Sequence, residues 1–239
     1  AASDVYKRQF LGNAFSKHRN SAFFTVENGK ALNGKIENVK RFAELGVRIM
    51  TLTWNDNNEI GSGVLSKDKC GLTDFGKLAI SEMEKYGNVI DISHASDELF
   101  YDVANQTNKP FIATHSNSRT VTRNPRNLTD EQIKIIISRG GIIGLNLHNA
   151  FLNNNPDKAC TEDILRHCEY MLSLGCENFL CFGTDFDGCD LPKDIVGSDS
   201  IGGIYELFLK NNYNESILKK IFYENAYKFF ENFDNQRIM

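Results

Sequence analysis

Two histidines stand at the ends of two apolar segments that are separated by one helical segment. His94 follows the apolar run 89–93, and His115 follows the run 111–114. In a parallel α/β barrel the carboxyl ends of the strands line a single mouth, where active sites lie. A single histidine there is readily explained as a hydrogen-bonded residue at a strand end. Two histidines at equivalent positions of adjacent repeats instead favour half of a metal site.

Two carboxylates also follow predicted strands. Glu27 comes after the run 22–26, and Asp185 comes after the run 179–183. With the two histidines they resemble a two-metal hydrolase site, in which a carboxylate bridges the metals and a shared water becomes the nucleophile. An aspartate at the last strand would take the proton of that water and pass it to a leaving amine. The alternative for Glu27 is a solvated carboxylate in a turn, whereas Asp185 directly follows a buried strand, where a carboxylate needs a partner.

The elements that would position these residues repeat along the chain. An apolar run followed by a helical segment that often ends at a glycine predicts βα units in a parallel sheet. The predicted strands are 22–26, 47–53, 89–93, 111–114, 142–147 and 179–183. The predicted helices are 34–45, 75–86 after the N-cap Thr73, one after the N-cap Ser96, 131–139 after a Thr129–Gln132 capping box, 161–174 with Thr161 as its cap, and 198–233 with a break at 211–214.

Two architectures fit parallel βα units. A doubly wound open sheet is the alternative, but no glycine-rich nucleotide-binding loop follows any strand. Polar residues end nearly every strand, which favours a (β/α)8 TIM barrel of the metal-dependent hydrolase type. Six strands are found, so we expect the first two to be missing. Residues 10–239 are predicted to form a single incomplete barrel domain, and residues 1–9 a non-native scar or misassembled end.

The composition narrows the class of protein. The 239 residues are 41% apolar and 24% charged, with a formal net charge of −4. No basic run suggests nucleic acid, and no segment approaches the length of a membrane span. The first residues lack the apolar core of a signal peptide. The six cysteines form no Cys-x-x-Cys pair, so we expect free thiols and a cytoplasmic location.

From about residue 20 to the end, the chain contains a series of motifs: TVENG at 25–29, LGVR at 45–48, LTWN at 52–55, GLTDFG at 71–76, IDISH at 90–94, THSN at 114–117, RNLTD at 126–130 and GTDFDG at 183–188. The order and spacing of these motifs resemble the membrane dipeptidase (renal dipeptidase) family of zinc peptidases. The resemblance implies a (β/α)8 barrel and an enzyme that hydrolyses dipeptides, often with tolerance of a D-residue at the C-terminal side of the substrate. It also implies that a homodimer is a frequent assembly.

The resemblance also implies roles for individual residues. Glu27 matches the ligand that bridges two zinc ions, and His94 and His115 match the two ligands of the second zinc. Arg126 matches the arginine that holds the substrate carboxylate, a task suited to a planar guanidinium. Asp185 matches the catalytic aspartate. The resulting hypothesis is that a hydroxide on a Glu27-bridged zinc pair attacks the peptide carbonyl while Asp185 shuttles the proton.

The sequence departs from the family pattern in two places. The family's His-x-Asp pair, which binds the first zinc, occurs nowhere in this chain. Trp54 stands where animal members have a histidine that is thought to stabilise the tetrahedral intermediate, so Asn55 is considered as a substitute donor. Three alternatives therefore stay open: another binuclear barrel hydrolase acting on a cyclic amide, lactone or phosphoester, an inactive fragment, or a binding protein. His148 and His167 are interpreted as structural.

Overall fold

The computed structural model describes residues 22–235. The predictions for residues 1–9, and for the start of the barrel domain before residue 22, lie outside the described residues. Within residues 22–235, no helix is both long enough and apolar enough to cross a bilayer.

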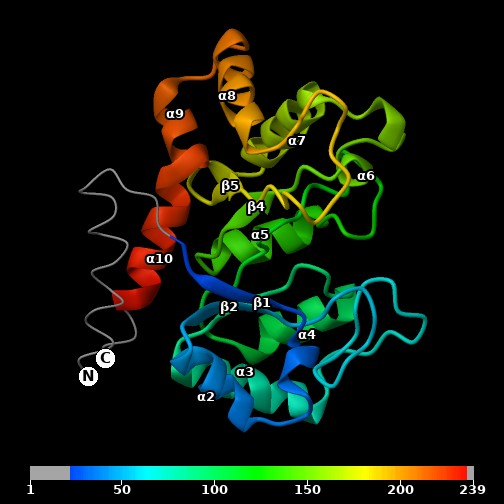
Figure 1. Ribbon diagram of the computed structural model, residues 1–239, viewed down its shortest axis with the longest axis vertical. Helices are drawn as coiled ribbons and strands as arrows, with labels where there is room; N and C mark the ends of the chain where they lie inside the picture. The colour runs from blue at the N-terminus through cyan, green and yellow to red at the C-terminus, as the bar shows by residue number, and fades with distance from the viewer. Residues whose placement is uncertain (1–21, 236–239) are drawn as a thin grey trace.

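Parallel strands form the centre of the molecule (Figure 1). One sheet contains β1 (Phe24–Glu27), β2 (Val47–Thr51) and β3 (Val89–Asp91), and a second contains β4 (Ile143–Leu145) and β5 (Leu180–Phe182). Parallel bridges from Asp91 to Ile112 and from Ala113 to Ile143 join the two sheets through the segment between them. The predicted strand 111–114 is therefore present as bridges rather than as a regular strand, and the parallel segments follow one another in sequence order.

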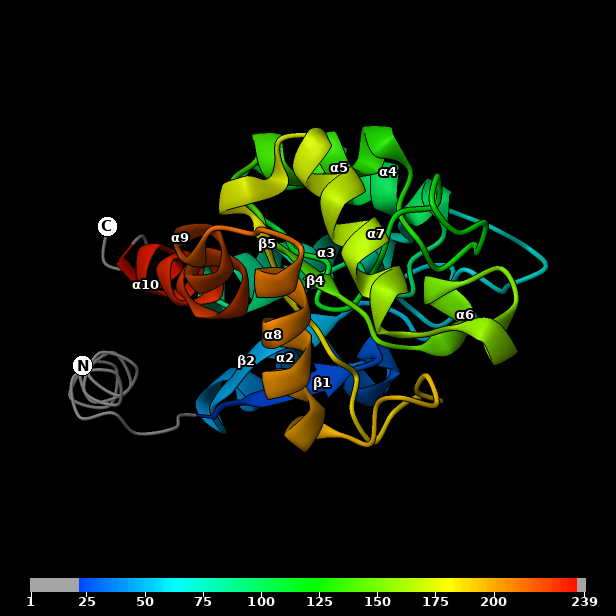
Figure 2. The same cartoon turned by 90° about the horizontal axis from the view of Figure 1, so that it is seen from above.

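Helices connect the strands and cover them. They are η1 (Gly29–Leu32), α2 (Glu37–Glu44), α3 (Asp74–Tyr86), α4 (Asp97–Gln106), α5 (Asp130–Ser138), α6 (Asn149–Leu152), η2 (Pro156–Lys158), α7 (Thr161–Ser173), η3 (Cys176–Asn178), η4 (Ser198–Ser200), α8 (Ile201–Lys210), α9 (Glu215–Lys219), η5 (Lys220–Glu224) and α10 (Asn225–Asn235). The short helices η1, α6, η2 and η3 do not appear among the predicted elements. Figure 2 shows α9 and α10 together at one end of the molecule, beside β5.

Local side-chain contacts explain where several helices begin. The hydroxyls of Thr73 and Ser96 accept hydrogen bonds from backbone N–H groups in the first turns of α3 and α4. The predicted Thr129–Gln132 capping box is present at α5. The predicted cap of α7 is wrong by one residue, because Cys160 is the N-cap and Thr161 is the first helical residue. There the Asp163 carboxylate accepts a hydrogen bond from the Cys160 backbone N–H.

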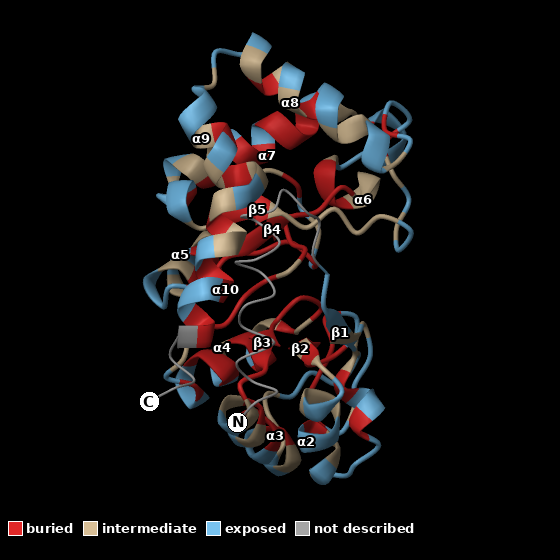
Figure 3. Ribbon diagram, turned by 60° about the vertical axis from the view of Figure 1, so that its left-hand side comes forward, coloured by how far each residue is buried: buried red, intermediate tan, exposed pale blue. Residues whose placement is uncertain are grey.

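Alternation along the strands divides their side chains between two faces. On one face, residues such as Met50, Ile90 and Ile143 pack in the main core with the surrounding helices. On the opposite face, here called the inner face, a second cluster packs against α10: Ile49, Val89, Ile112, Ile142 and Cys181 contact Phe229, Phe230 and Phe233. Figure 3 shows that β2, β3, β4 and β5 are mostly buried, whereas β1 and many residues of the helices are exposed. Because α10 covers the inner face near the amino ends of the strands, the site lies at their carboxyl ends.

Candidate active site

Three potential metal ligands meet at the carboxyl ends of the parallel segments. Glu27 is the last residue of β1, and His94 and His115 follow β3 and the next bridged segment. His94 Nε2 lies 2.9 Å from Glu27 Oε1 and 2.9 Å from His115 Nε2. All three ligand atoms lie within 4.8 Å of one another. The structure therefore brings together the three residues that the sequence predicts as ligands.

His94 is oriented by its backbone and by Asn55. Its φ of 69° places it in the left-handed region, which is uncommon for a residue other than glycine. The Asn55 side-chain oxygen lies 2.9 Å from His94 Nδ1, so Nδ1–H donates and Nε2 faces the other ligands. Asn55 thus orients a ligand through its amide oxygen, whereas its predicted role as an oxyanion donor concerns the Nδ2 end of the amide and stays a prediction. The Trp54 ring lies 5.9 Å from the His94 ring and is 48% exposed, at the rim of the site.

His115 is oriented through Thr114 by a carboxylate that sequence reasoning missed. The Thr114 hydroxyl donates to Asp91 Oδ2 at 2.6 Å and lies 2.8 Å from His115 Nδ1, so it accepts the Nδ1 proton. Asp91 is completely buried and also accepts from the Thr51 hydroxyl and from the Ser93 and Thr114 backbone N–H groups. The signal in the sequence was an aspartate inside a strand buried on both faces, where a carboxylate requires several donors.

The electrostatics of the three residues fit a bound divalent cation. Burial lowers the pKa values of His94 and His115, which favours neutral imidazoles. The adjacent His94 imidazole is the main cause that lowers the pKa of Glu27, against the opposing effect of burial. With both Nδ1 protons donated away, two Nε2 lone pairs face each other at 2.9 Å. A cation between them would relieve this repulsion, and imidazole with carboxylate is a common zinc ligand set.

Asp185 shares a pocket with these ligands. The pocket lies on the inner face and is lined by residues that include Thr51, Thr114, Glu27, His115 and Asp185. The Asp185 backbone is left-handed, with a φ of 57°, and Asn146 Nδ2 donates to Asp185 Oδ2 at 3.1 Å. Such strained backbone conformations are common at functional sites. Asp185 is therefore held beside the ligands by one amide, in a position to exchange a proton.

Arg126 is a buried cation, and two of its nitrogen atoms find no hydrogen-bond acceptor among the described residues. Its side chain is 7% exposed, and its Nε and Nη2 atoms have no hydrogen-bond partner. Its guanidinium carbon lies 5.2 Å from the centre of the Phe151 ring. Burial lowers the pKa of Arg126 to about 10, while Asp91, Asp185 and Glu27 act in the opposite direction. A buried guanidinium with free donors is suited to an anionic ligand, since leaving such donors unpaired is costly.

The other candidate residues lie in structural positions. His167 is fully buried, accepts a hydrogen bond from the Ser118 backbone N–H and has Nε2 within 3.2 Å of the Leu152 carbonyl oxygen. His148 Nδ1 lies 3.1 Å from the Asp190 carbonyl oxygen. All six cysteines are free thiols, as the sequence predicts.

Comparison with known proteins identifies relatives of the whole described fold. The family model described as membrane dipeptidase (Peptidase family M19) matches residues 4–237. An uncharacterised protein in the pqqA 5′ region of Klebsiella pneumoniae is 31% identical over 217 residues, which are 87% of this chain and 80% of that protein. An uncharacterised dipeptidase of Schizosaccharomyces pombe is 26% identical over 82% of this chain, which spans 48% of that relative.

Solved structures show the same relationship. The crystal structure of dipeptidase AC, a metallopeptidase of family M19, matches with a TM-score of 0.87 and 28% identity, covering 92% of this chain and 69% of that one. A metallopeptidase from Rhodobacter sphaeroides, solved with a phosphinate mimic of the dipeptide L-Ala-D-Ala, matches with a TM-score of 0.86 and 28% identity. That match covers 92% of this chain and 66% of the other.

Proposed function

Since the chain belongs to the membrane dipeptidase family, a family of metallopeptidases that hydrolyse peptide bonds, we propose that it hydrolyses dipeptides with zinc as its metal. The observation that carries the proposal is the pairing of a metal-ligand cluster with a buried, unpartnered arginine. The cluster suits activation of a peptide carbonyl and a water. The arginine suits the free carboxylate that distinguishes a dipeptide from an internal peptide segment.

Glu27, His94 and His115 would hold one zinc. When bound, the metal would polarise the scissile carbonyl and lower the pKa of a water molecule. The resemblance assigns Glu27 to both metals of a two-zinc site, and the described residues contain this one histidine-bearing ligand cluster. Asn55 and Thr114 keep the two imidazoles in the tautomer that presents Nε2.

The remaining roles belong to Asp185, Arg126 and Trp54. Asp185 Oδ2 is occupied by Asn146, so Oδ1 would accept a proton from the attacking water. As the water oxygen bonds to the carbonyl carbon and the C–N bond breaks, that proton passes to the leaving amine. Arg126 would bind the C-terminal carboxylate with Nε and Nη2, and the exposed Trp54 would line the entrance. Because the Asn55 oxygen is engaged by His94, an oxyanion role for Asn55 would use its Nδ2–H groups.

Several finer features are part of the same proposal. The parallel segments, with candidate ligands at their carboxyl ends, would form part of the wall of a (β/α)8 barrel, and this arrangement of ligands supports that fold. The L-Ala-D-Ala mimic bound by the Rhodobacter relative supports a substrate with a C-terminal D-residue. A homodimer and a cytoplasmic location stay predictions.

A substrate panel tests the proposal. Zinc-loaded protein is assayed with alanyl-alanine of both C-terminal configurations, the corresponding C-terminal amides, a lactone, a cyclic amide and a phosphodiester. We expect turnover of the free dipeptides, and we expect Arg126→Met to raise their KM by about 10–100-fold, the value of a charged hydrogen-bonded pair. Arg123→Met, which removes an exposed arginine of the same loop, is the control. Preferred turnover of the lactone, cyclic amide or phosphodiester would reject a dipeptidase. Zinc binding without any hydrolysis would identify a binding protein instead.

A further inference from the structure

The position of Arg126 is not set by hydrogen bonds at Nε or Nη2. Those two atoms are buried without a partner, and the ring of Phe151 provides the packing contact beneath the guanidinium. The direction of the side chain therefore depends on the backbone that carries it. That backbone belongs to the 116–128 loop, which runs from His115 towards α5 and has no helix or strand of its own.

Arg119 holds this loop on both sides of Arg126. Its Nε donates to the Asn127 carbonyl oxygen at 2.7 Å, and its Nη2 donates to the Pro125 carbonyl oxygen at 3.0 Å. Its backbone N–H also donates to the Leu128 carbonyl oxygen at 2.7 Å. The residues immediately before and after Arg126 are thus fixed by one guanidinium group, which is planar and presents its donors in a rigid arrangement.

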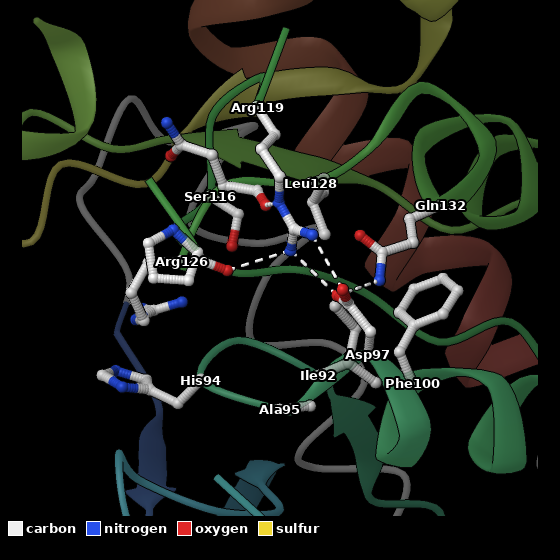
Figure 4. A pocket seen from close by; sticks show the side chains of 12 residues that line it. Ile92, His94, Ala95, Asp97, Phe100, Ser116, Arg119, Arg126, Leu128 and Gln132 are labelled. Atoms are coloured by element: carbon white, nitrogen blue, oxygen red, sulfur yellow. Dashed lines mark hydrogen bonds and ion pairs between the residues drawn. The ribbon is translucent and has the colours of Figure 1, made fainter. Parts of the chain in front are cut away.

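The same guanidinium is anchored to the helix that follows His94. Arg119 Nη1 and Nη2 each lie 2.8 Å from an oxygen of Asp97, in a bidentate ion pair. This pair is the first cause that lowers the pKa of Asp97, and Gln132 also donates to Asp97 at 2.8 Å. Asp97 is the first residue of α4, and its N-cap is Ser96. Figure 4 shows Arg119 reaching Asp97 in a cavity whose wall also includes His94 and Arg126.

We propose that Arg119 and Asp97 are a positioning pair that sets the separation between Arg126 and the His94 metal ligand, and thereby the length of the substrate. The inference rests on the proposed function, because it concerns the carboxylate that Arg126 would bind. A dipeptide places its scissile carbonyl a fixed number of bonds from its C-terminal carboxylate. Small errors in such a separation reduce activity strongly, since the reacting groups must be aligned. Neither residue touches the substrate in this account.

Arg119→Lys is the most informative variant. Lysine keeps the charge but lacks the planar fork, so it cannot hold Asp97 and both carbonyl oxygens in the same geometry. Steady-state kinetics of the zinc-loaded protein are measured with alanyl-alanine, its C-terminal amide and alanyl-β-alanine, which is one methylene longer. In the wild type we expect the free carboxylate and the shorter substrate to give the higher kcat/KM. In Arg119→Lys we expect both preferences to narrow by about tenfold, the typical size of a one-methylene discrimination.

Three further measurements separate positioning from general stability. In Arg119→Lys the zinc affinity should stay unchanged, and hydrogen exchange of the backbone N–H groups of Asn124 and of residues 126–128 should become faster. Arg123→Lys, on the exposed side of the same loop, should change neither preference. If Arg119→Lys does not fold, the same preferences are measured with Asp97→Asn, because this change weakens the ion pair while leaving the arginine in place.

The outcomes distinguish this inference from the proposed function. If Arg126→Met removes the carboxylate preference while folded Arg119→Lys or Asp97→Asn retains both preferences, the positioning pair is rejected and the dipeptidase proposal stands. If Arg126→Met leaves the carboxylate preference intact, the proposed substrate site is itself wrong. A loss of thermal stability in Arg119→Lys with unchanged preferences would assign Arg119 to folding alone.

Discussion

Asp91 is connected to His115 through a single hydroxyl group. Thr114 Oγ1 lies 2.6 Å from Asp91 Oδ2 and 2.8 Å from His115 Nδ1. The buried carboxylate therefore determines which imidazole nitrogen carries the proton, although it does not touch the ring. Partners of this kind orient metal-ligating histidines and raise their basicity.

Replacing Thr114 with valine should weaken metal binding. Valine preserves the shape of threonine but removes the hydroxyl that accepts the His115 proton. We expect zinc affinity, measured by competition with a chelator, to fall by about 10–100-fold, as for other losses of a ligand's hydrogen-bond partner. Thr120→Val is a matched control, because it removes a hydroxyl bonded to Asp130 at an exposed position. Equal zinc affinity in both variants would contradict the orienting role.

Glu27→Gln should lose both metal and hydrolysis. The pKa of Glu27 lies below its ordinary value of 4.5, chiefly through the adjacent His94 imidazole, so the wild-type side chain is a carboxylate at neutral pH. Glutamine keeps the size but removes the charge that a divalent cation requires. Metal content after dialysis and turnover of alanyl-alanine are the measurements, with Glu59→Gln in an exposed loop as the control. Retained zinc with full turnover would refute the ligand assignment.

The free energy of unfolding of the protein should decrease as the pH is lowered, partly because of His167. Burial lowers the pKa of His167 from 6.5 to about 4. Between these values the unfolded chain binds a proton that the native state does not, so the free energy of unfolding decreases as the pH falls through this window. At pH 4.5 the lost contribution is about 2.5 kcal/mol relative to pH 7.

His167→Gln tests this pH dependence. Glutamine can still accept from the Ser118 N–H and donate to the Leu152 carbonyl oxygen, but it does not titrate. Urea denaturation at pH 7 and pH 4.5 should show a smaller difference in the variant than in the wild type, by about 2.5 kcal/mol. Parallel pH curves for the two proteins would show that His167 does not contribute.

Gly183 should resist substitution because the backbone of Thr114 lies against it. A Cβ atom at Gly183 would lie 1.8 Å from the Thr114 carbonyl oxygen, whereas one at Gly202 in α8 would meet nothing within 4 Å. We expect Gly183→Ala to lower the free energy of unfolding by about 1–3 kcal/mol or more through overpacking. Gly202→Ala should raise it by about 0.4–1 kcal/mol through a less flexible unfolded chain. Denaturant titration of both variants gives the comparison, and equal effects would refute the packing explanation.

Local sequence signals predicted many helix boundaries. The hydroxyls of Thr73 and Ser96 and the capping box at Thr129 act within a few residues of their own positions. Such contacts need no information from the rest of the chain. The prediction that Thr161 is the N-cap of α7 was wrong by one residue. The N-cap is Cys160, whose backbone N–H donates to the Asp163 carboxylate. Cysteine is not among the residues that favour N-cap positions, so no local signal marked this residue as the cap. The segment 111–114 forms single bridges to its two neighbours, a detail that apolar character does not reveal.

Sequence alone was sufficient to place Glu27, His94, His115 and Asp185 at the ends of parallel segments, because side-chain alternation and strand direction follow from local pattern. It did not identify their supporting partners. Asn55 lies 39 residues from His94, Thr114 lies 23 residues from Asp91, and Arg119 lies 22 residues from Asp97. Those contacts depend on the register between neighbouring strands and on the path of two long loops. Both result from packing across the whole domain, so only the folded arrangement shows which donor meets which acceptor.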